Sequence, residues 1–452
     1  MASTRLTRTP SSGDNQKYTV SCWVKRTGLG ASTTVYSTGD TTANNNGRML
    51  FIDADDKIEI SYYNSGYTYE VTTNRVLRDT NAWYHIVVAF DTTQATASDR
   101  IKIWVNGEQE SSFATSSYPS LNASFNFGSA THYIGDLGGR SIYSDFVLSH
   151  LHYIDGTTYA ASDFGQTDTA SGIWTPKPSP SVTYGTNGVF LNFANSSDLG
   201  NDVSGNNNDF TMSGTGTQTL DTPSNVFATL NALNSTLTNS TLTNGNLQFA
   251  GGRQDANYAF TSGTIAPSQG KWYWEVKAVD NAEIDQVGVA KMDLAQFANI
   301  SNSGGLQATT YGGKGVQFSN GVKVGDGSGS TYMGGFSAND VLMVALDLDN
   351  GNIYFGRNGQ WSDGAGNADQ TFANAVAAFT NLTVGDAYVP AHCMRNFGGS
   401  NPGESEYNFG NGIFGTTAVS TPESDSAGLG KFEYSVPTGY YALCTKNIAD
   451  YG

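Results

Sequence analysis

Apolar side chains recur at every second residue over short stretches of this chain, and a period of two is the pattern of a half-buried β-strand. The alternation is clear at residues 18–24, 57–62 and 101–105, where we find no convincing helical periodicity. The dipeptide Asn106-Gly107 directly follows the third stretch and favours the positive φ angles of a tight hairpin turn. Short strands separated by such turns predict a β-sandwich in the N-terminal part of the chain.

The strand pattern returns after residue 246. Trp272 and Trp274 share one face of a predicted strand, and the run 341–346 is apolar throughout, as in a strand that is covered on both faces. The dipeptide Asn358-Gly359 marks a hairpin turn between further strands. We therefore predict an all-β fold with two antiparallel β-sandwich (jelly-roll-like) domains.

The segment between the two sandwiches has a different character. Three prolines at residues 174–180 remove donors that a central strand needs, and residues 201–209 are a cluster of turn formers. A pentapeptide that occurs twice, at 235–239 and 240–244, lacks charged and aromatic residues, and we interpret it as a linker. An extended, loop-rich connector is therefore predicted. The expected parts are a first sandwich at 1–160, a connector partly packed on it at 161–245, and a second sandwich with a C-terminal extension at 246–452.

Net charge and composition exclude several classes of partner. The chain has 452 residues and a formal net charge of −17, which repels nucleic-acid phosphates and anionic lipids. No apolar run reaches the roughly 18 residues of a membrane span. We therefore expect neither nucleic-acid binding nor membrane insertion. Because no apolar segment follows the N-terminal arginines and the three cysteines cannot all pair, we expect a chain made in a host cytoplasm without a signal peptide.

Residues from about 15 to 160 resemble a laminin-G-like domain of the concanavalin A-like lectin/glucanase superfamily. The resemblance rests on the order and spacing of Tyr18–Val24, Trp83–Val87, Ile103–Gly107, and His132–Gly135 followed by Phe146–Asp155. It implies a sandwich of the kind that binds carbohydrate in lectins.

Residues from about 246 to 415 resemble a SPRY domain. The matching segments are Gly270–Val276, Val287–Val289, Asp340-Val341, Ala345–Gly359 and Val389-Pro390. The resemblance implies a second sandwich whose loops form a surface for a partner.

The connector resembles a pattern common in virion proteins of tailed phages. Its segments are Tyr153–Gly156, Asp163–Gly165, Gly172–Pro176, Tyr184–Gly188, Asp202–Thr211 and Asp221–Asn225, with Pro437–Asn447 near the C-terminal end. This resemblance implies a non-enzymatic structural or adhesion protein of a virion, in a tail fibre, elsewhere on the tail or on the capsid exterior. Such a protein binds other virion proteins and itself, as a homo-oligomer, and has a host-surface glycan or protein as a further partner. The alternatives are a polysaccharide depolymerase of the virion and an intracellular SPRY-type adaptor.

Motifs for catalysis are incomplete in this sequence. Retaining glucanases of the superfamily carry Glu-x-Asp-x-x-Glu along one strand, whereas Glu283-Ile-Asp285 lacks the final glutamate and lies in the SPRY-like part. We find neither a Gly-x-Ser-x-Gly elbow nor a Walker-type phosphate loop. We therefore expect no catalytic residue and no cofactor.

Two groups of residues have side chains that bind metals in other proteins. Asp53, Asp55 and Asp56 offer oxygen ligands for calcium, but a complete site needs about six oxygens, so calcium at these aspartates stays an open alternative to a solvated turn. His150 and His152 share one face of a predicted strand, without an evident third ligand for zinc. We predict no metal site.

Aromatic residues near two turns are the predicted ligand-binding residues. Tyr63, Tyr67 and Tyr69 have the same parity around a turn, and tyrosine rings stack on the apolar faces of sugars. Trp361 follows the turn at 358–359 and is the predicted anchor of the SPRY-like loop surface. The alternative for all four is packing, either in the core or against a neighbouring subunit.

Overall fold

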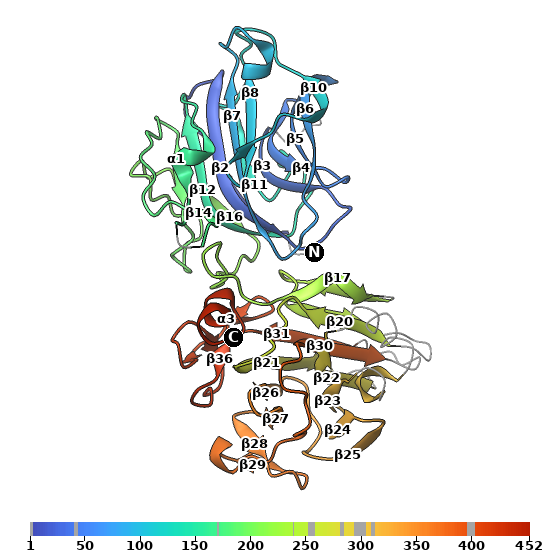
Figure 1. Ribbon diagram of the computed structural model, residues 1–452. Coiled ribbons are helices and arrows are strands. Elements are labelled where there is room, and N and C mark those ends of the chain that lie inside the picture. Colours follow the sequence, from blue (N-terminus) through green and yellow to red (C-terminus); the bar gives the residue numbers. More distant parts are fainter. Residues whose placement is uncertain are drawn as a thin grey trace. The chain divides into compact units, whose positions relative to one another are not determined.

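The computed structural model describes residues 3–39, 44–169, 171–237, 239–251, 258–280, 284–292, 304–308, 312–395 and 403–452. The chain divides into two compact units, Met1–Gln218 and Thr219–Gly452, and Figure 1 shows that each is built of β-strands. Strand pairing is antiparallel in every sheet, except where β36 (Tyr441–Ala442) pairs parallel to β21 (Lys271–Asp280). The predicted all-β fold with two antiparallel sandwiches is confirmed.

The first unit contains two large sheets. Sheet A has the strand order β10 (Phe113–Ser117), β6 (Tyr67–Val76), β5 (Lys57–Tyr63), β4 (Asn46–Ile52), β3 (Thr33–Gly39), β11 (Thr131–Ile134), β1 (Arg5–Arg8) and β16 (Thr211–Ser213). Sheet B has the order β15 (Val189–Leu191), β12 (Phe146–Asp155), β2 (Lys17–Arg26), β7 (Trp83–Asp91), β8 (Ile101–Val105) and β9 (Glu108–Gln109).

Alternate residues of these strands form the core between sheets A and B. Val20 and Ile103 from sheet B and Ile60 and Val71 from sheet A are fully buried in one hydrophobic cluster. Burial of each such side chain stabilises the fold by about 1.5–3 kcal/mol relative to exposure. The apolar residues that recur with a period of two in the sequence therefore lie on the inner faces of the sandwich.

Residues 161–218 of the predicted connector belong to the first unit. Helix α1 (Ala161–Phe164) and the strand pair β13 (Gly165–Thr167) and β14 (Trp174–Pro176) follow β12, and β15 and β16 then join the edges of sheets B and A. Phe164 packs with Val87 and Ile154 of sheet B, and Trp174 lies against this cluster. The connector is ordered on the first unit because sheet B is apolar on both faces and needs this cover.

The turn cluster at 201–209 is held by hydrogen bonds rather than by apolar packing. The buried Asp202 carboxylate accepts the backbone N–H groups of Phe190 (2.8 Å) and Asn208 (2.9 Å). The side-chain amides of Asn206 and Asn208 both donate to the carbonyl of Gly188 at 3.0 Å. The asparagines and aspartates of this motif thus satisfy backbone groups of the edge strand β15 and of the turns beside it.

The second unit also contains two large sheets. Sheet C has the order β17 (Leu230–Thr236), β20 (Ala259–Gly263), β30 (Tyr388–Arg395), β22 (Ile284–Lys291), β23 (Lys314–Gln317), β24 (Val322–Gly325) and β25 (Ser328–Thr331). Sheet D has the order β18 (Ser240–Thr243), β19 (Gln248–Gly251), β31 (Gly403–Asn408), β21, β26 (Val341–Asp347), β27 (Asn352–Arg357), β28 (Gln360–Ser362) and β29 (Ala368–Gln370).

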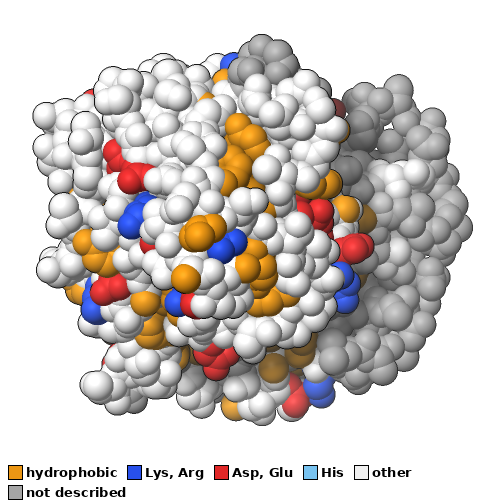
Figure 2. All heavy atoms as spheres, turned by 90° about the horizontal axis from the view of Figure 1, so that it is seen from above, with side chains coloured by type: hydrophobic (Ala, Val, Ile, Leu, Met, Phe, Trp, Pro, Cys, Tyr) orange, Lys and Arg blue, Asp and Glu red, His pale blue; other side chains and the backbone are white. Residues whose placement is uncertain are grey.

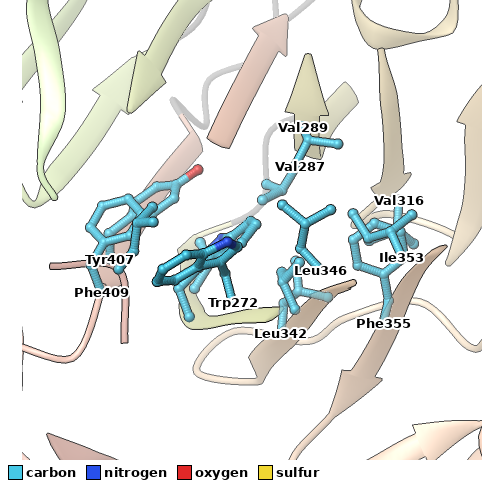
Figure 3. Packing of buried hydrophobic residues seen from close by; sticks show 14 of the residues in the cluster. Trp272, Val287, Val289, Val316, Leu342, Leu346, Ile353, Phe355, Tyr407 and Phe409 are labelled. Carbon is cyan, nitrogen blue, oxygen red and sulfur yellow. The ribbon is translucent and has the colours of Figure 1, made fainter. Parts of the chain in front are cut away.

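The core of the second unit lies between sheets C and D. Figure 3 shows Trp272 beside Leu342 and Leu346 of the neighbouring strand, with Val287 and Val289 of sheet C nearby. All five side chains are buried. The two tryptophans that the sequence placed on one strand face are both in this core, since Trp274 belongs to the same cluster.

The repeated pentapeptide contributes to two edge strands instead of forming a linker, because residues 235–236 lie in β17 and residues 240–243 in β18. Ser235 and Thr236 of β17 pair with β20, and β18 pairs with β19 over its whole length. An edge strand buries little side-chain surface, so short polar residues suffice there and the usual apolar signal is missing. Residues 219–245 of the predicted connector accordingly lie in the second unit.

The C-terminal part of the second unit covers the outer face of sheet D. We call residues 423–444 the strap; it contains β34 (Glu423–Ser424), β35 (Lys431–Phe432) and β36, and helix α3 (Thr445–Tyr451) follows it. Phe432 and Tyr440 of the strap are buried against Tyr273 and Met343, on the face of sheet D that points away from the main core. Sheet D is therefore covered on both faces.

We expect Asp202→Ala to lower the free energy of unfolding of the first unit by about 2–4 kcal/mol, because buried N–H groups lose their acceptor. Urea unfolding followed by hydrogen exchange of β2 amides measures this loss. The control is Asp198→Ala, which removes an exposed carboxylate that accepts the Gly200 N–H at 3.1 Å. Equal effects of the two substitutions would contradict the structural role of Asp202.

Candidate binding surface

The outer face of sheet A carries a row of polar side chains that crosses the strands. Strand pairing aligns one residue from each neighbouring strand, and directly paired residues lie on the same face of a sheet. We call these residues the polar row: Thr7, Tyr133, Ser37, Arg48, Ser61, Glu70 and Ser117. The row combines hydroxyl, guanidinium and carboxylate groups, which hydrogen-bond to hydroxyl-rich ligands.

Access to the polar row differs along its length. Ser37 is buried, because its hydroxyl donates to the carbonyl of Asp136 (2.7 Å) and accepts the N–H of Gly138 (3.0 Å) in a covering loop. Glu70 is half-buried and Ser117 is exposed. The accessible members of the row are therefore Arg48 on β4, Glu70 on β6 and Ser117 on β10, while Ser61 of β5 is buried.

Two of the predicted tyrosines stand at this accessible end. Tyr63 is 38% exposed and Tyr67 is 51% exposed, and the two residues pair across the β5–β6 hairpin. Their rings meet edge to face, with centroids 5.5 Å apart and an interplanar angle of 86°. Aromatic rings that are this exposed, yet held by a hairpin, can stack on a ligand.

The third tyrosine of the hairpin is a core residue, which corrects the prediction from parity. Tyr69 is 0% exposed and pairs with Tyr62, whereas Tyr63 pairs with Tyr67. Thr68 is thus an extra residue in β6, and this β-bulge turns Tyr69 to the inner face. Parity predicts a shared face only where pairing is regular, and the sequence gives no sign of the bulge.

Arg48 holds the polar row and the tyrosines together. Its Nη1 donates to a carboxylate oxygen of Glu59 and to the hydroxyl of Tyr67 (3.0 Å). The guanidinium also lies over the ring of Phe51, 4.4 Å from the centroid. Arg48 is therefore fixed in place beside the exposed ring of Tyr67.

The two carboxylates near Arg48 differ in their bonding. Glu59 accepts from Arg48 and from the hydroxyl of Ser61 at 2.7 Å. Glu70 accepts one long hydrogen bond, 3.5 Å, from the hydroxyl of Thr72, and it forms no ion pair within the described ranges. Glu70 is consequently the carboxylate of this surface with acceptor capacity left for a ligand.

Arg48 and Glu70 were not identified from the sequence. Each is a single polar residue in a strand, which is the ordinary pattern of an outer face. Only the register of the strands shows that Arg48 and Glu70 both pair with Ser61, one from each neighbouring strand. The alternation of apolar residues predicts the strands, but it does not show which polar residues become neighbours across them.

The chain is poor in charged residues. On the face of the molecule drawn in Figure 2, apolar and charged side chains form small separate groups on a mostly uncharged surface. Charged residues are 14% of the chain. Recognition by hydrogen bonds and ring stacking suits such a surface better than recognition of a highly charged polymer.

Trp361 is the second predicted binding residue that the structure places in a core. It is 3% exposed and belongs to the cluster beneath the strap. Its ring packs at 4.8 Å from that of Phe372 and at 6.4 Å from that of Tyr273. Because the ring is enclosed, Trp361 is not available as an anchor for a partner in this conformation.

The three clustered aspartates stabilise a turn. Asp56 is bound by Arg26 (2.6 Å) and Arg78 (3.0 Å), and these bonds hold its pKa below the ordinary value although burial acts in the opposite direction. Asp53 accepts the backbone N–H groups of Asp55 and Lys57, both at 2.9 Å. Carboxylates that are committed to arginines and backbone donors make a poor calcium site.

The two histidines predicted on one strand face are separated by a bulge in β12. His150 has a positive φ of 47°, and the pairing register shifts between Ser149 and His152. His152 is buried, and its Nδ1 lies 2.9 Å from the hydroxyl of Tyr184. In the part of the chain that the structure describes, no three His, Cys, Asp or Glu side chains gather as a metal site requires.

The acidic pair considered for glycoside hydrolysis has no exposed carboxylate in the described structure. Glu283 lies outside the described residues. Asp285 is fully buried and accepts a hydrogen bond from Nε2 of His392, whose Nδ1 lies 2.8 Å from the hydroxyl of Tyr407. Asp285 therefore contributes to a buried polar network between sheets C and D, where a substrate cannot reach it. As for membranes, no helix among the described ranges combines the length and the apolar surface needed to cross a bilayer.

Comparison with family models identifies both domain types. A model described as "Concanavalin A-like lectin/glucanases superfamily" matches residues 2–153, and a model described as "SPRY domain" matches residues 271–412. The two resemblances seen in the sequence are thereby confirmed for these ranges. No curated protein matches the chain in sequence.

Solved structures similar to this chain include SPRY domains. The chain is similar to the SPRY domain of human HERC1, with 15% identity over 38% of this chain and 92% of that chain at a TM-score of 0.29. It is similar to the TRIM65 PSpry domain, with 16% identity over 40% of this chain and 91% of that one at a TM-score of 0.29. It is also similar to stonustoxin, with 13% identity, 40% of this chain, 27% of that chain and a TM-score of 0.29.

We expect Trp361→Ala to lower the free energy of unfolding of the second unit by about 3–5 kcal/mol, because it empties a filled core site. Tyr67→Ala, in contrast, should change the stability of the first unit by less than about 0.5 kcal/mol, because the ring is exposed. Chemical denaturation with hydrogen exchange of each unit compares them. A mild effect of Trp361→Ala would restore that residue as a surface anchor.

Proposed function

Because the chain joins a concanavalin A-like domain of laminin-G type to a SPRY domain, we propose that it is a non-enzymatic adhesion protein of a tailed-phage virion. Its first unit binds a host-surface glycan, and its second unit contacts other proteins of the particle. The two domain types are binding folds, which supports the general role. The resemblance of segments within 153–225 and 437–447 to phage virion proteins supports the place on a particle.

The observation that carries the glycan proposal is the exposed pair Tyr63 and Tyr67 beside the accessible part of the polar row. A sugar ring has apolar faces that stack on tyrosine, and its hydroxyls need donors and acceptors around its rim. Arg48 on β4 supplies N–H donors, and Glu70 on β6 supplies acceptor oxygens. Both strands pair with β5, so these groups lie close to the tyrosines of the β5–β6 hairpin. The surface therefore has both elements of sugar recognition on one rigid sheet.

The charges of this surface favour a neutral glycan. Arg48 is paired with Glu59, and Glu70 adds one further negative charge in a chain of net charge −17. An acidic polysaccharide would meet repulsion that is only partly screened over the Debye length of about 8 Å at physiological salt. We accordingly propose hexose-rich or N-acetylhexosamine-rich neutral chains as the ligand class.

The absence of turnover is part of the proposal. Glycoside hydrolysis needs two carboxylates at a fixed spacing, one of which must be free to protonate a leaving group. Glu59 is engaged by Arg48 and Ser61, and this bonding favours a structural role for its carboxylate. A depolymerase of the virion is the competing outcome, and product analysis distinguishes it.

We expect the purified chain to bind neutral bacterial oligosaccharides on a glycan array, and Tyr67→Ala to weaken binding about tenfold, the equivalent of about 1.4 kcal/mol of lost stacking. The control is Tyr451→Ala, which removes a tyrosine of similar exposure, 41%, from the second unit. Mass spectrometry of the recovered oligosaccharide reports turnover. Unchanged binding by Tyr67→Ala would refute the site, and shortened chains would establish the depolymerase instead.

The place on a virion has its own test. Mass spectrometry of purified particles should find the chain in a copy number that matches a symmetry axis, as expected for a homo-oligomeric fibre or decoration. Antibody labelling under the electron microscope would then show its position. Presence in the infected-cell cytoplasm alone would favour the intracellular adaptor.

A further inference from the structure

A buried glutamate lies where the strap meets sheet D. Glu275 is in the middle of β21, between Trp274 and Val276, whose side chains point into the main core. Its own side chain points to the opposite face, the one that the strap covers. Glu275 is 0% exposed, so its carboxylate is not accessible to solvent.

The carboxylate of Glu275 is bound directly to the backbone of the strap. One oxygen accepts the N–H of Tyr434 and the other accepts the N–H of Glu433, both at 2.9 Å. The hydroxyl of Tyr273 donates to it at 2.9 Å, and the amide of Asn408 lies at 3.4 Å. Within the described ranges no lysine, arginine or histidine forms an ion pair with it.

Among the described residues, no positively charged residue is paired with Glu275 across the strands, although Lys277 lies on the same face of β21. Its direct neighbours on β26 and β31 are Met343 and Asn408, which are neutral. The titratable groups around it are Tyr273 on its own strand and Glu433 and Tyr434 on the strap. Burial raises the pKa of both tyrosines, so they stay neutral, and Glu433 adds like-charge repulsion.

We propose that the strap is a pH-sensitive cover of sheet D, which opens more often as the pH rises from about 5.5 to about 8.5. The group that responds to pH is the carboxylate of Glu275, which is buried when the strap is closed and hydrated when the strap is open. Opening exposes Tyr273, Met343 and Trp361, a largely apolar sheet face that is closed at lower pH.

The direction of the effect follows from proton linkage. Burial raises the pKa of Glu275 from 4.5 to about 7, and the donors from the strap only partly oppose this. In the opened form the carboxylate meets water, and its pKa returns toward the ordinary value. The opened form therefore loses its proton at lower pH than the closed form, so a rising pH favours opening. With these two pKa values, the opening constant rises about 30-fold between pH 5.5 and 8.5.

Hydrogen exchange of the full chain over this pH range tests the proposal. Exchange rates are first corrected for the intrinsic dependence on pH, which leaves the opening equilibrium of each segment. We expect protection of the amides at 431–444 to fall about 30-fold between pH 5.5 and 8.5, while amides of β26 keep their protection. Constant protection of the strap, or an equal loss in β26, would overturn the proposal.

Two substitutions distinguish the effect of Glu275 on the pH dependence from the effects of other carboxylates. Glu275→Gln should remove the pH dependence of strap protection, because an amide cannot ionise. Glu423→Gln is the control, since it neutralises an exposed carboxylate on the strap itself and should leave the dependence intact. Should Glu275→Gln fail to fold, Glu433→Gln should shift the midpoint of the dependence to lower pH, because a repelling charge is removed. An unshifted midpoint in that variant would contradict the role of Glu275.

Discussion

Buried carboxylates that accept backbone N–H groups hold the irregular segments of both units onto their sheets. Asp202 does so for the turn cluster of the first unit, and Glu275 does so for the strap of the second. A carboxylate with several N–H donors needs no cation, so this device suits a chain with few basic residues. The position of the strap, and hence the closure of the outer face of sheet D, depends on the bonds to Glu275.

The covers decide which sheet face is left for a ligand. The outer face of sheet B is occupied by residues that follow β12, and the outer face of sheet D is occupied by the strap. The outer face of sheet A instead presents a polar row with two exposed tyrosines at its accessible end. A binding role in the first unit is therefore best placed on sheet A, where polar groups are fixed by the strands beneath them.

The sequence predicted the parts of the structure that arise from side-chain alternation. Both sandwiches and their core residues, such as Val20 and Trp272, follow from a period of two because core packing selects apolar residues at inward positions. The bulge that turns Tyr69 inward, and the register that joins Arg48 to Glu70 through Ser61, arise from pairing between strands, which a single sequence does not encode locally. The prediction of Trp361 as an anchor fails because nothing in the sequence shows that the strap covers this residue.

We propose above all that sheet A holds a glycan without changing it. Hydrogen exchange of the chain with and without a saturating neutral oligosaccharide, followed by mass analysis of that oligosaccharide, tests this claim most directly. We expect slower exchange confined to the ends of β4, β5 and β6 around Tyr63 and Tyr67, and an oligosaccharide of unchanged mass. Protection elsewhere in the chain, or a ligand recovered in shorter pieces, would contradict it.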